Sequence, residues 1–252
     1  ISLLTGSKLL HATDFETADG LLRVSRSWRS TPVGNAATLL YAPIGLGRGW
    51  RLDLMPELHI KPRVDAAKVS LHWPDGSSWD FRRQSNGTMT PYSISMSKLP
   101  HSEFRLSFEG TWPTDLGTVE DSVTQWKVID PSGNVWIFAT FNNFISETPP
   151  RYRTGLPISR TTPAGYRLDF SYGEHSELTG IADSCGRTLG FEWILFDENT
   201  PPDFLDKPIR PMAISGIALP DATSLRYSYT PIVAIGAPVE PGGRNLLRLP
   251  AR

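Results

Sequence analysis

Residues 166–193 read YRLDFSYGEHSELTGIADSCGRTLGFEW and contain strand-like segments joined through an Asp-centred turn. The same order recurs at residues 214–229, which read ISGIALPDATSLRYSY. Apolar and polar residues alternate in both stretches, so an extended chain presents the apolar ones on one face. Gly165 and Gly186 stand 21 positions apart, a spacing typical of repeat architectures. These stretches therefore predict a series of β-hairpins with one buried face.

The same spacing of a small turn residue and two apolar residues occurs five times. The apolar residues follow the turn residue by three and five positions, so both members of a pair lie on one strand face. The sets are Gly76 with Trp79 and Phe81, Gly133 with Trp136 and Phe138, Gly165 with Leu168 and Phe170, Gly186 with Leu189 and Phe191, and Ala222 with Leu225 and Tyr227. Four of the five turns have glycine, which adopts positive φ without a steric penalty. An aspartate precedes four of them, as is typical of tight turns. We predict that each pair is shielded from water on one sheet face.

The predicted fold class is all-β, a curved and spiralling sheet in which β-hairpins add edge to edge. With 21 Gly and 22 Pro in 252 residues, the composition suits many short strands joined by turns. The predicted organisation has four parts: an opening region at 1–60, irregular β-hairpin units at 61–150, more regular repeats at 151–230, and a Pro- and Gly-rich connection at 231–252.

The opening region contains the motif GLGRGW at residues 45–50. Its glycines have the spacing G-x-G-x-G, and no Lys-Ser or Lys-Thr pair follows them, unlike a phosphate-binding loop. We expect Gly45, Gly47 and Gly49 to let the chain turn closely beneath Trp50.

Charge and hydropathy exclude several classes of protein. A formal net charge of -1 gives no basic field, so we expect no nucleic-acid partner. No run approaches the 18 or so apolar residues that a membrane-spanning helix needs. Cys185 is the single cysteine, so the chain has no internal disulfide. The chain begins with Ile1 and shows no signal-peptide pattern, and we expect it to be a piece of a longer protein.

The residues that could carry chemistry are scattered, and we predict no catalysis, no cofactor and no metal site. The histidines show neither the H-E-x-x-H pattern nor a close pair. They are His11, His59, His72, His101 and His175. A nucleophile formed by Cys185 and His175 is conceivable, but a turn thiol packed against its neighbours is favoured. The carboxylate groups at Glu120–Asp121 and 197–206 do not converge as glycoside hydrolysis requires.

From Thr5 to about Tyr229, the chain resembles the N-terminal part of the Rhs/YD-repeat core of bacterial polymorphic toxins. The resemblance rests on TGSKLLHATDFETADGLLRVSRSWRS at residues 5–30, followed by GLGRGW, with the family's residues in the same order. The matching positions are Thr5, Gly6, Lys8, Thr13, Asp14, Phe15, Arg26, Trp28, Ser30, Gly45, Leu46, Gly47, Gly49 and Trp50. Downstream, the family's repeat is matched most closely at residues 178–193, and Gly133, Gly165 and Gly186 take the turn positions.

The resemblance implies a shell segment. The complete shell of this family is a hollow cocoon that encloses a C-terminal toxin domain for delivery to competitor or host cells. Partners would be the remaining repeats, the enclosed toxin and secretion-apparatus proteins, and the chain would be made in a bacterial cytoplasm and then secreted. Shell-lining candidates are Trp79, Phe81, Trp136, Phe138, Phe170, Phe191 and Tyr227.

The family's cores end in an aspartyl autoproteolysis site around a DPxGL motif. This chain has Asp130-Pro131-Ser132-Gly133, but Asn134 stands where leucine is expected. Because Asp-Pro-x-Gly is also a common β-turn sequence, we assign these residues to a hairpin turn.

A second function class stays open. YD-repeat chains also occur as cell-surface modules, and the eight tryptophans could bind carbohydrate or protein. Exposed, mutually spaced aromatic side chains would favour this alternative, whereas alternation along strands favours buried tryptophans.

Overall fold

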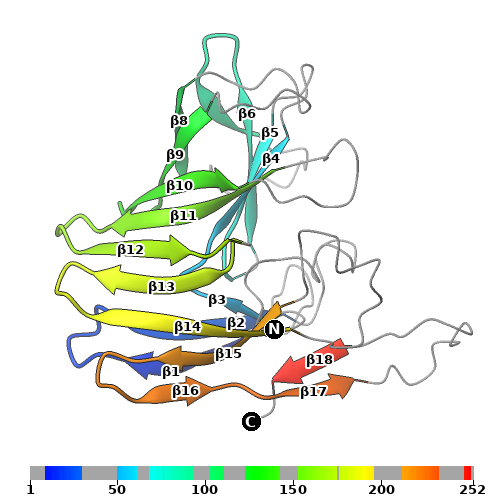
Figure 1. Cartoon of the computed structure of the whole chain (residues 1–252). Helices are drawn as coiled ribbons and strands as arrows, with labels where there is room; N and C mark the ends of the chain where they lie inside the picture. Colours follow the sequence, from blue (N-terminus) through cyan, green and yellow to red (C-terminus); the bar gives the residue numbers. More distant parts are fainter. Residues whose placement is uncertain are drawn as a thin grey trace, which may run out of the picture.

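The computed structural model describes ten segments of the chain (Figure 1). They are residues 9–29, 50–61, 68–75, 77–92, 103–110, 123–141, 153–174, 176–195, 212–232 and 247–250. Within these segments the regular structure is all β-strand, and every strand pairing is antiparallel, so the all-β prediction is confirmed. Across the same ranges there is no helix with the length and hydropathy to cross a membrane.

Eighteen strands are described. The first three are β1 (Leu9–Glu16), β2 (Arg23–Arg29) and β3 (Trp50–Leu52). The middle of the chain contains β4 (Glu57–Lys61), β5 (Lys68–His72), β6 (Ser78–Arg83), β7 (Met89–Tyr92), β8 (Arg105–Gly110), β9 (Val123–Ile129) and β10 (Val135–Phe141). The remainder are β11 (Arg153–Thr161), β12 (Arg167–Tyr172), β13 (Leu178–Asp183), β14 (Thr188–Leu195), β15 (Met212–Ala218), β16 (Ser224–Arg226), β17 (Tyr229–Ile232) and β18 (Leu247–Pro250).

The strands form one long sheet and two small ones. Thirteen strands belong to the long sheet, whereas β1–β2–β3 and β17–β18 form sheets of three and two strands. In Figure 1 the strands from β10 to β16 lie side by side in the order of the sequence, and β4 to β9 curl away at one end of the sheet. The three-stranded sheet lies behind the strands β14 to β16. The long sheet is therefore curved, with its strands added hairpin by hairpin.

The long sheet divides at β11. One edge of β11 pairs with β10 along its length, from Thr161 to Thr154. The other edge is shared, because residues 159–161 pair with β12 and residues 153–155 pair with β4. Pro157, which has no N–H to donate, lies between the two pairings. Its carbonyl accepts a 2.7 Å hydrogen bond from the Tyr172 hydroxyl. Three ribbons of strands thus meet on one central strand.

The hairpin turns share one hydrogen-bond pattern. In the turn at Asp183, the Asp183 N–H donates to the Arg187 carbonyl and the Gly186 N–H donates to the Asp183 carbonyl. The same pair of bonds closes the turns at Asp130, Thr162 and Leu219. The fourth residue of each turn has positive φ: 81° at Gly133, 86° at Gly165, 82° at Gly186 and 65° at Ala222. These turns lie where the spacing predicts them, and Gly76 lies outside the described residues.

The predicted apolar pairs face one core. Ile181 lies opposite Phe170 on one side and Leu189 on the other. Ile217 likewise lies opposite both Phe191 and Leu225. Of the ten pair residues, seven are buried, and Trp79, Leu225 and Tyr227 are partly buried and pack against the same cluster. The prediction that each pair shares a mostly shielded sheet face is confirmed.

The three-stranded sheet covers part of this apolar face. Leu22, Val24 and Leu52 are at most 2% exposed and belong to the same cluster as Phe191 and Ile217 of the long sheet. The short segment 53–56 joins β3 directly to β4, so the chain turns from one sheet into the other at this point.

The C-terminal segment adds a hairpin-like pair of strands. β17 and β18 pair from Tyr229 opposite Pro250 to Ile232 opposite Leu247. Residues 231–252, predicted to be a connection, therefore include part of one strand and all of another. The division of the chain into four parts stays a prediction.

Candidate functional site

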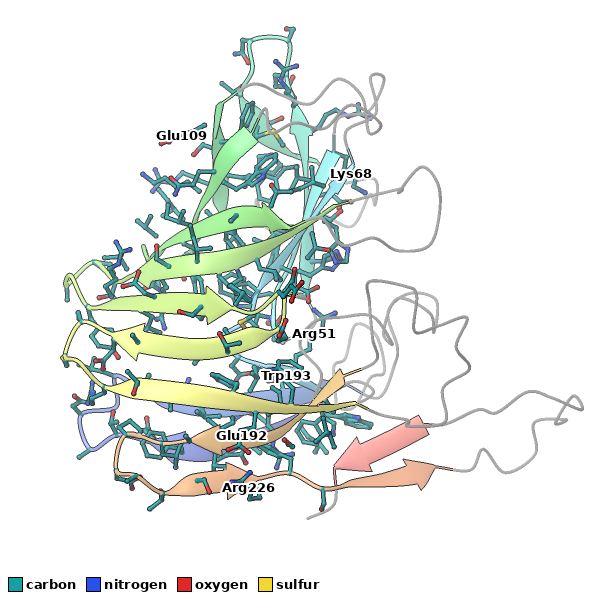
Figure 2. The ribbon with its side chains drawn as sticks, in the orientation of Figure 1. Arg51, Lys68, Glu109, Glu192, Trp193 and Arg226 are labelled. Carbon is teal, nitrogen blue, oxygen red and sulfur yellow. The ribbon has the colours of Figure 1, made fainter. Side chains whose placement is uncertain are left out.

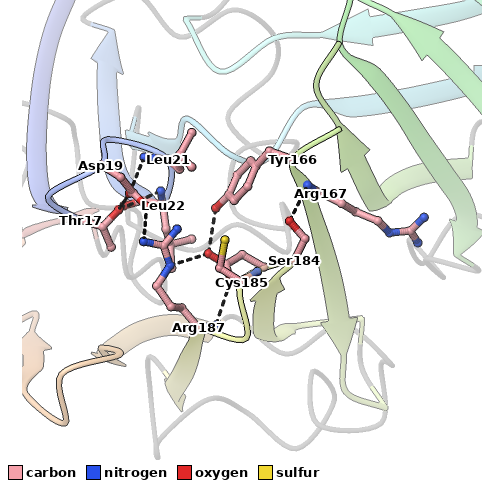
Figure 3. Close-up of polar contacts among 10 residues, drawn as sticks. Thr17, Asp19, Leu21, Leu22, Tyr166, Arg167, Ser184, Cys185 and Arg187 are labelled. Atoms are coloured by element: carbon pink, nitrogen blue, oxygen red, sulfur yellow. Dashed lines mark hydrogen bonds and ion pairs between the residues drawn. The ribbon is translucent and has the colours of Figure 1, made fainter. Parts of the chain in front are cut away.

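The buried carboxylate of Asp183 organises the turn between β13 and β14. Its Oδ1 accepts the N–H groups of Cys185 at 2.9 Å and Arg187 at 2.8 Å. Its Oδ2 accepts Nε of Arg187 at 2.6 Å and the hydroxyl of Tyr166 at 3.1 Å (Figure 3). Burial acts to raise the pKa of Asp183, but the hydrogen bonds from Arg187, Tyr166 and Cys185 outweigh it and lower the pKa. Burial and the contact with Asp183 raise the pKa of Tyr166 to about 12.

Arg187 joins this turn to the N-terminal sheet. Its Nη1 lies 2.7 Å from Oδ2 of Asp19, in the turn between β1 and β2 (Figure 3). Asp19 is itself fixed, because its Oδ1 accepts the Thr17 hydroxyl at 2.6 Å and the Leu21 N–H at 3.0 Å. The ion pair joins residues that are 168 positions apart in the sequence. It thereby attaches the first hairpin to one of the last.

A second contact attaches the N-terminal sheet to the end of the long sheet. The Tyr227 hydroxyl donates to Oδ2 of Asp14 at 2.9 Å, and Nε of Arg26 lies 2.8 Å from the same oxygen. The guanidinium of Arg26 also lies over the rings of Trp50, at 4.6 Å, and Tyr227, at 5.5 Å. Two of the residues that carry the family resemblance, Asp14 and Arg26, thus fix the sheet-to-sheet contact. Trp50 is partly buried in this contact, and Gly45, Gly47 and Gly49 lie outside the described residues.

Several shell-lining candidates touch one another in the core. Trp136 packs edge-on against Trp73 at 5.5 Å and stacks with Phe170 at 6.5 Å. Phe104 bridges Trp73 and Trp79 at ring distances of 4.9 and 4.3 Å. The structure places Phe81, Phe138, Phe170 and Phe191 in the same cluster. Other side chains of this chain therefore surround these candidates.

The opposite face of the long sheet is polar. Arg167 and Asp169 form an exposed ion pair on β12. Glu192 of β14 and Arg226 of β16 meet across Gly216 of β15, where a Cβ atom would lie 2.8 Å from the Arg226 Nη1 (Figure 2). The alternation along the strands therefore separates an apolar inner face from a charged outer face.

Asp130 of the Asp-Pro-Ser-Gly motif is a turn residue. Its Oδ1 accepts the Ser132 and Asn134 N–H groups at 2.9 and 3.0 Å. Its Oδ2 accepts the Asn134 side-chain amide at 2.7 Å and the Trp136 indole N–H at 3.0 Å. Asn134, which departs from the family's cleavage motif, thus helps to hold the carboxylate in the hairpin.

The expectation for Cys185 is partly wrong. The residue occupies the predicted turn, but its thiol is exposed rather than packed against neighbours. The reason is that Asp183 and Arg187 make the polar contacts of this turn, whereas residues 184–186 at its tip face the solvent. His175 and the carboxylates at 120–121 and 197–206 lie outside the described residues.

The structure forms one polar cluster that the sequence analysis missed. The rings of His59 on β4 and His72 on β5 have centroids 4.1 Å apart, although the two histidines are not close in the sequence. The Nε2 of His59 lies 3.2 Å from Oε2 of the buried Glu57, which is directly opposite His72 in the strand register. Pairing of β4 with β5 brings the two histidines together, and only a correct strand register could have revealed them. In the described part of the chain no three His, Cys, Asp or Glu residues are arranged to hold a metal ion.

Comparisons with known proteins find a family that matches the start of the chain and several solved structures of similar fold. Residues 1–81 match the family described as "Domain of unknown function (DUF6531)". The N-terminal domain of effector protein SpvB from Salmonella typhimurium strain LT2 is structurally similar, with 14% sequence identity and a TM-score of 0.46. That similarity covers 85% of this chain and 91% of the SpvB domain. No curated protein matches the chain.

Proposed function

We propose that this chain is a segment of a protein shell of the Rhs/YD-repeat kind, which encloses a toxin domain during export and delivery. The resemblance of residues 5–50 supports this proposal, and so does the architecture. A sheet that is extended by successive hairpins, with one apolar and one polar face, can be continued around an enclosed domain by adding more hairpins of the same kind.

The single observation that carries the proposal is the open end of the hairpin series. β16 pairs with β15, and no second partner of β16 is found in the described part of the chain. An unpaired edge exposes backbone N–H and C=O groups, and such edges recruit another strand. We infer that further hairpins, on the same or another polypeptide, pair with β16 and continue the sheet.

We infer a specific place for this segment from its packed core. Because the N-terminal sheet and the ring cluster fill the inner face here, the segment would close one end of a shell rather than line its lumen. The lumen would then be formed by later hairpins, and the seven shell-lining candidates would support the closed end.

Co-expression tests this function directly. The purified chain should self-associate or precipitate, whereas co-expression with a polypeptide that carries further hairpins of the same kind should give a soluble complex of defined mass by light scattering. A monodisperse, stable monomer that does not bind the added hairpins would contradict the proposal.

We infer no catalytic step for this segment. Asp183 and Asp130 each accept four hydrogen bonds, which commits both carboxylates to turn structure. Cys185→Ser should therefore leave assembly and toxin delivery unchanged. Loss of delivery with normal assembly in this variant would show that the thiol has a chemical role.

The binding-module alternative lacks a supporting observation. Where the structure gives side-chain exposure, the exposed large apolar residues are Leu10, Leu21 and Ile194, and none is aromatic. A stacking platform for sugars needs exposed rings. Binding to a glycan array that is lost on substitution of a tryptophan would nevertheless favour the alternative.

A further inference from the structure

The cluster around Glu57 combines buried charge with incomplete hydrogen bonding. The Glu57 side chain is 3% exposed, and its Oε2 contacts His59. Its Oε1 and the Nη1 of Arg51, on β3, are buried with no hydrogen-bond partner among the described residues. His59 and His72 lie on the same face of neighbouring strands, ring against ring. Four ionisable groups from three strands therefore meet in a small volume.

The cluster contains more potential positive charge than negative charge. Glu57 is one carboxylate, and it faces Arg51 and the two imidazoles. Asp80 on β6 also attracts a proton on His72. However, Asp80 already lies 2.6 Å from the Lys68 ammonium and accepts the Ser70 hydroxyl at 2.7 Å. Tyr172 on β12 faces Glu57, and burial and this carboxylate raise its pKa, so the hydroxyl stays neutral. Protonation of both imidazoles would leave uncompensated positive charge.

We propose that the cluster of Glu57, His59, His72 and Arg51 is an acid-sensitive junction, which releases the N-terminal sheet from the long sheet when the pH falls. Arg51 belongs to the N-terminal sheet, where it lies opposite Ser27, whereas the other three residues belong to the long sheet. Repulsion between Arg51 and protonated imidazoles acts across the corner at residues 53–56. The backbone bonds of that corner are few: Asp53 N–H to the Ser25 carbonyl and Met55 N–H to the Leu52 carbonyl.

The direction of the pH effect follows from His72. Burial, and next the neighbouring His59, lower its pKa from 6.5 to about 3, so it is neutral in the closed state. An opened cluster returns the ring to water and to its ordinary pKa. Stability from the neutral ring is thus complete above pH 6.5 and is lost as the pH falls from 6.5 toward 3. By proton linkage, His72 alone should favour opening about 100-fold more at pH 4.5 than at pH 7.5.

One other sheet-to-sheet contact, the ion pair of Asp19 with Arg187, resists this change over the same pH range. Hydrogen bonds from Thr17 and Leu21, with the help of Arg187, lower the pKa of Asp19 to about 2. The Asp19–Arg187 pair thus keeps its charges at pH 4.5. Opening should begin at the β3–β4 corner, and the hairpins from β9 to β14 should remain closed.

Hydrogen exchange of the full chain, resolved by peptide, tests this junction. After correction for intrinsic exchange rates, amides of β2 and β3 should open about 100-fold more at pH 4.5 than at pH 7.5. Amides of β9 to β14 should change by less than about tenfold.

His72→Phe keeps an aromatic ring without a titrating group and should reduce the β2–β3 response at least tenfold. His11→Gln removes a half-exposed imidazole that pairs with Asp53, and should keep the response within about threefold of wild type.

Three results would overturn the proposal. They are an unchanged response in His72→Phe, no response in the wild-type chain, and simultaneous opening of all strands. If His72→Phe does not fold, imidazole NMR of the wild-type chain decides the question. In the folded chain His72 should remain neutral down to about pH 5, and titration near pH 6.5 would refute the junction.

Discussion

At the residue scale, the turns carry the information that fixes the hairpins. A residue with positive φ ends each tight turn, and glycine holds that position at Gly133, Gly165 and Gly186. Ala222 holds the equivalent position at φ 65°, where a Cβ atom crowds the backbone. The fifth set of the repeat therefore keeps the turn at a steric cost.

Exchanging the turn residues should shift stability in opposite directions. Ala222→Gly should raise the free energy of unfolding by about 0.5–1 kcal/mol, because glycine adopts this φ without penalty. Gly186→Ala should lower it by about 1–2 kcal/mol. A Cβ atom added at Gly186 would meet open space, so the loss of stability would come from backbone strain at positive φ and not from a clash with other residues. Urea denaturation of both variants measures these changes, and equal effects of one sign would argue against the turn geometry.

Asp183 should contribute far more than an exposed aspartate. Asp183→Asn should cost about 2–4 kcal/mol, because it weakens bonds to Arg187 and Tyr166 and leaves Asp19 as the remaining carboxylate beside the partly buried guanidinium. Asp169→Asn removes one partner of an exposed pair and should cost less than about 0.5 kcal/mol. Urea denaturation of the two variants at neutral pH measures both losses, and equal losses would contradict the role assigned to Asp183.

The pH dependence gives Asp183 a further signature. Its pKa is lowered from 3.8, so its contribution is present above pH 3.8 and is lost as the pH falls through the folded-state pKa. The difference between wild type and Asp183→Asn should therefore shrink in acid. A difference that grows below pH 4 would contradict the assigned ionisation.

At the element scale, the hairpins depend on contacts between neighbouring strands. Ile181 is 1% exposed and lies between Phe170 and Leu189, whereas Thr179 on the same strand is exposed. Ile181→Ala should lower the free energy of unfolding by about 2–4 kcal/mol. Thr179→Ala should change it by about 0.5 kcal/mol or less. Chemical denaturation distinguishes the two, and similar losses would mean that the inner and outer faces are wrongly assigned.

Local spacing predicts these hairpins because all of the relevant interactions are close in sequence. The turn residue, its aspartate and the two apolar residues lie within about ten positions, so period and turn chemistry suffice. The predicted pairs at Trp136 and Phe138, and at Leu189 and Phe191, are accordingly buried.

Long-range pairing was beyond the reach of the same reasoning. The pairing of β4 with β11 joins Leu58 to Gly155, and nothing in the spacing of either segment specifies it. The pair His59 and His72 depends on the register of β4 and β5, and the contact of Asp14 with Tyr227 depends on how two sheets pack. Each is decided by the complementary shape and charge of distant segments.

At the scale of the whole molecule, the last hairpins of the long sheet contact the N-terminal sheet. The first hairpin contacts Arg187 and Tyr227, which belong to the last described hairpins of the long sheet. Such contacts form only after the intervening strands are ordered, so we expect the N-terminal sheet to dock late in folding. Refolding monitored by pulsed hydrogen exchange should show protection of β12 to β14 before protection of β1 and β2. The reverse order would mean that the first sheet templates the rest.

The division at β11 has a mechanical consequence. A pulling force applied at Ile232 against the N-terminal strands would first break the contacts of Tyr227 and Arg187, and would then peel β16, β15 and the strands before them in turn. The 21 residues from Gly165 to Gly186 would lengthen the chain by roughly 70 Å, and the 36 residues from Gly186 to Ala222 by roughly 120 Å. The peeling would stop at β11, because that strand is held by β10 on one edge and by β4 on the other. Optical-tweezer traces should therefore show small steps followed by one much stronger rupture, so β11 would act as the anchor of the molecule under load.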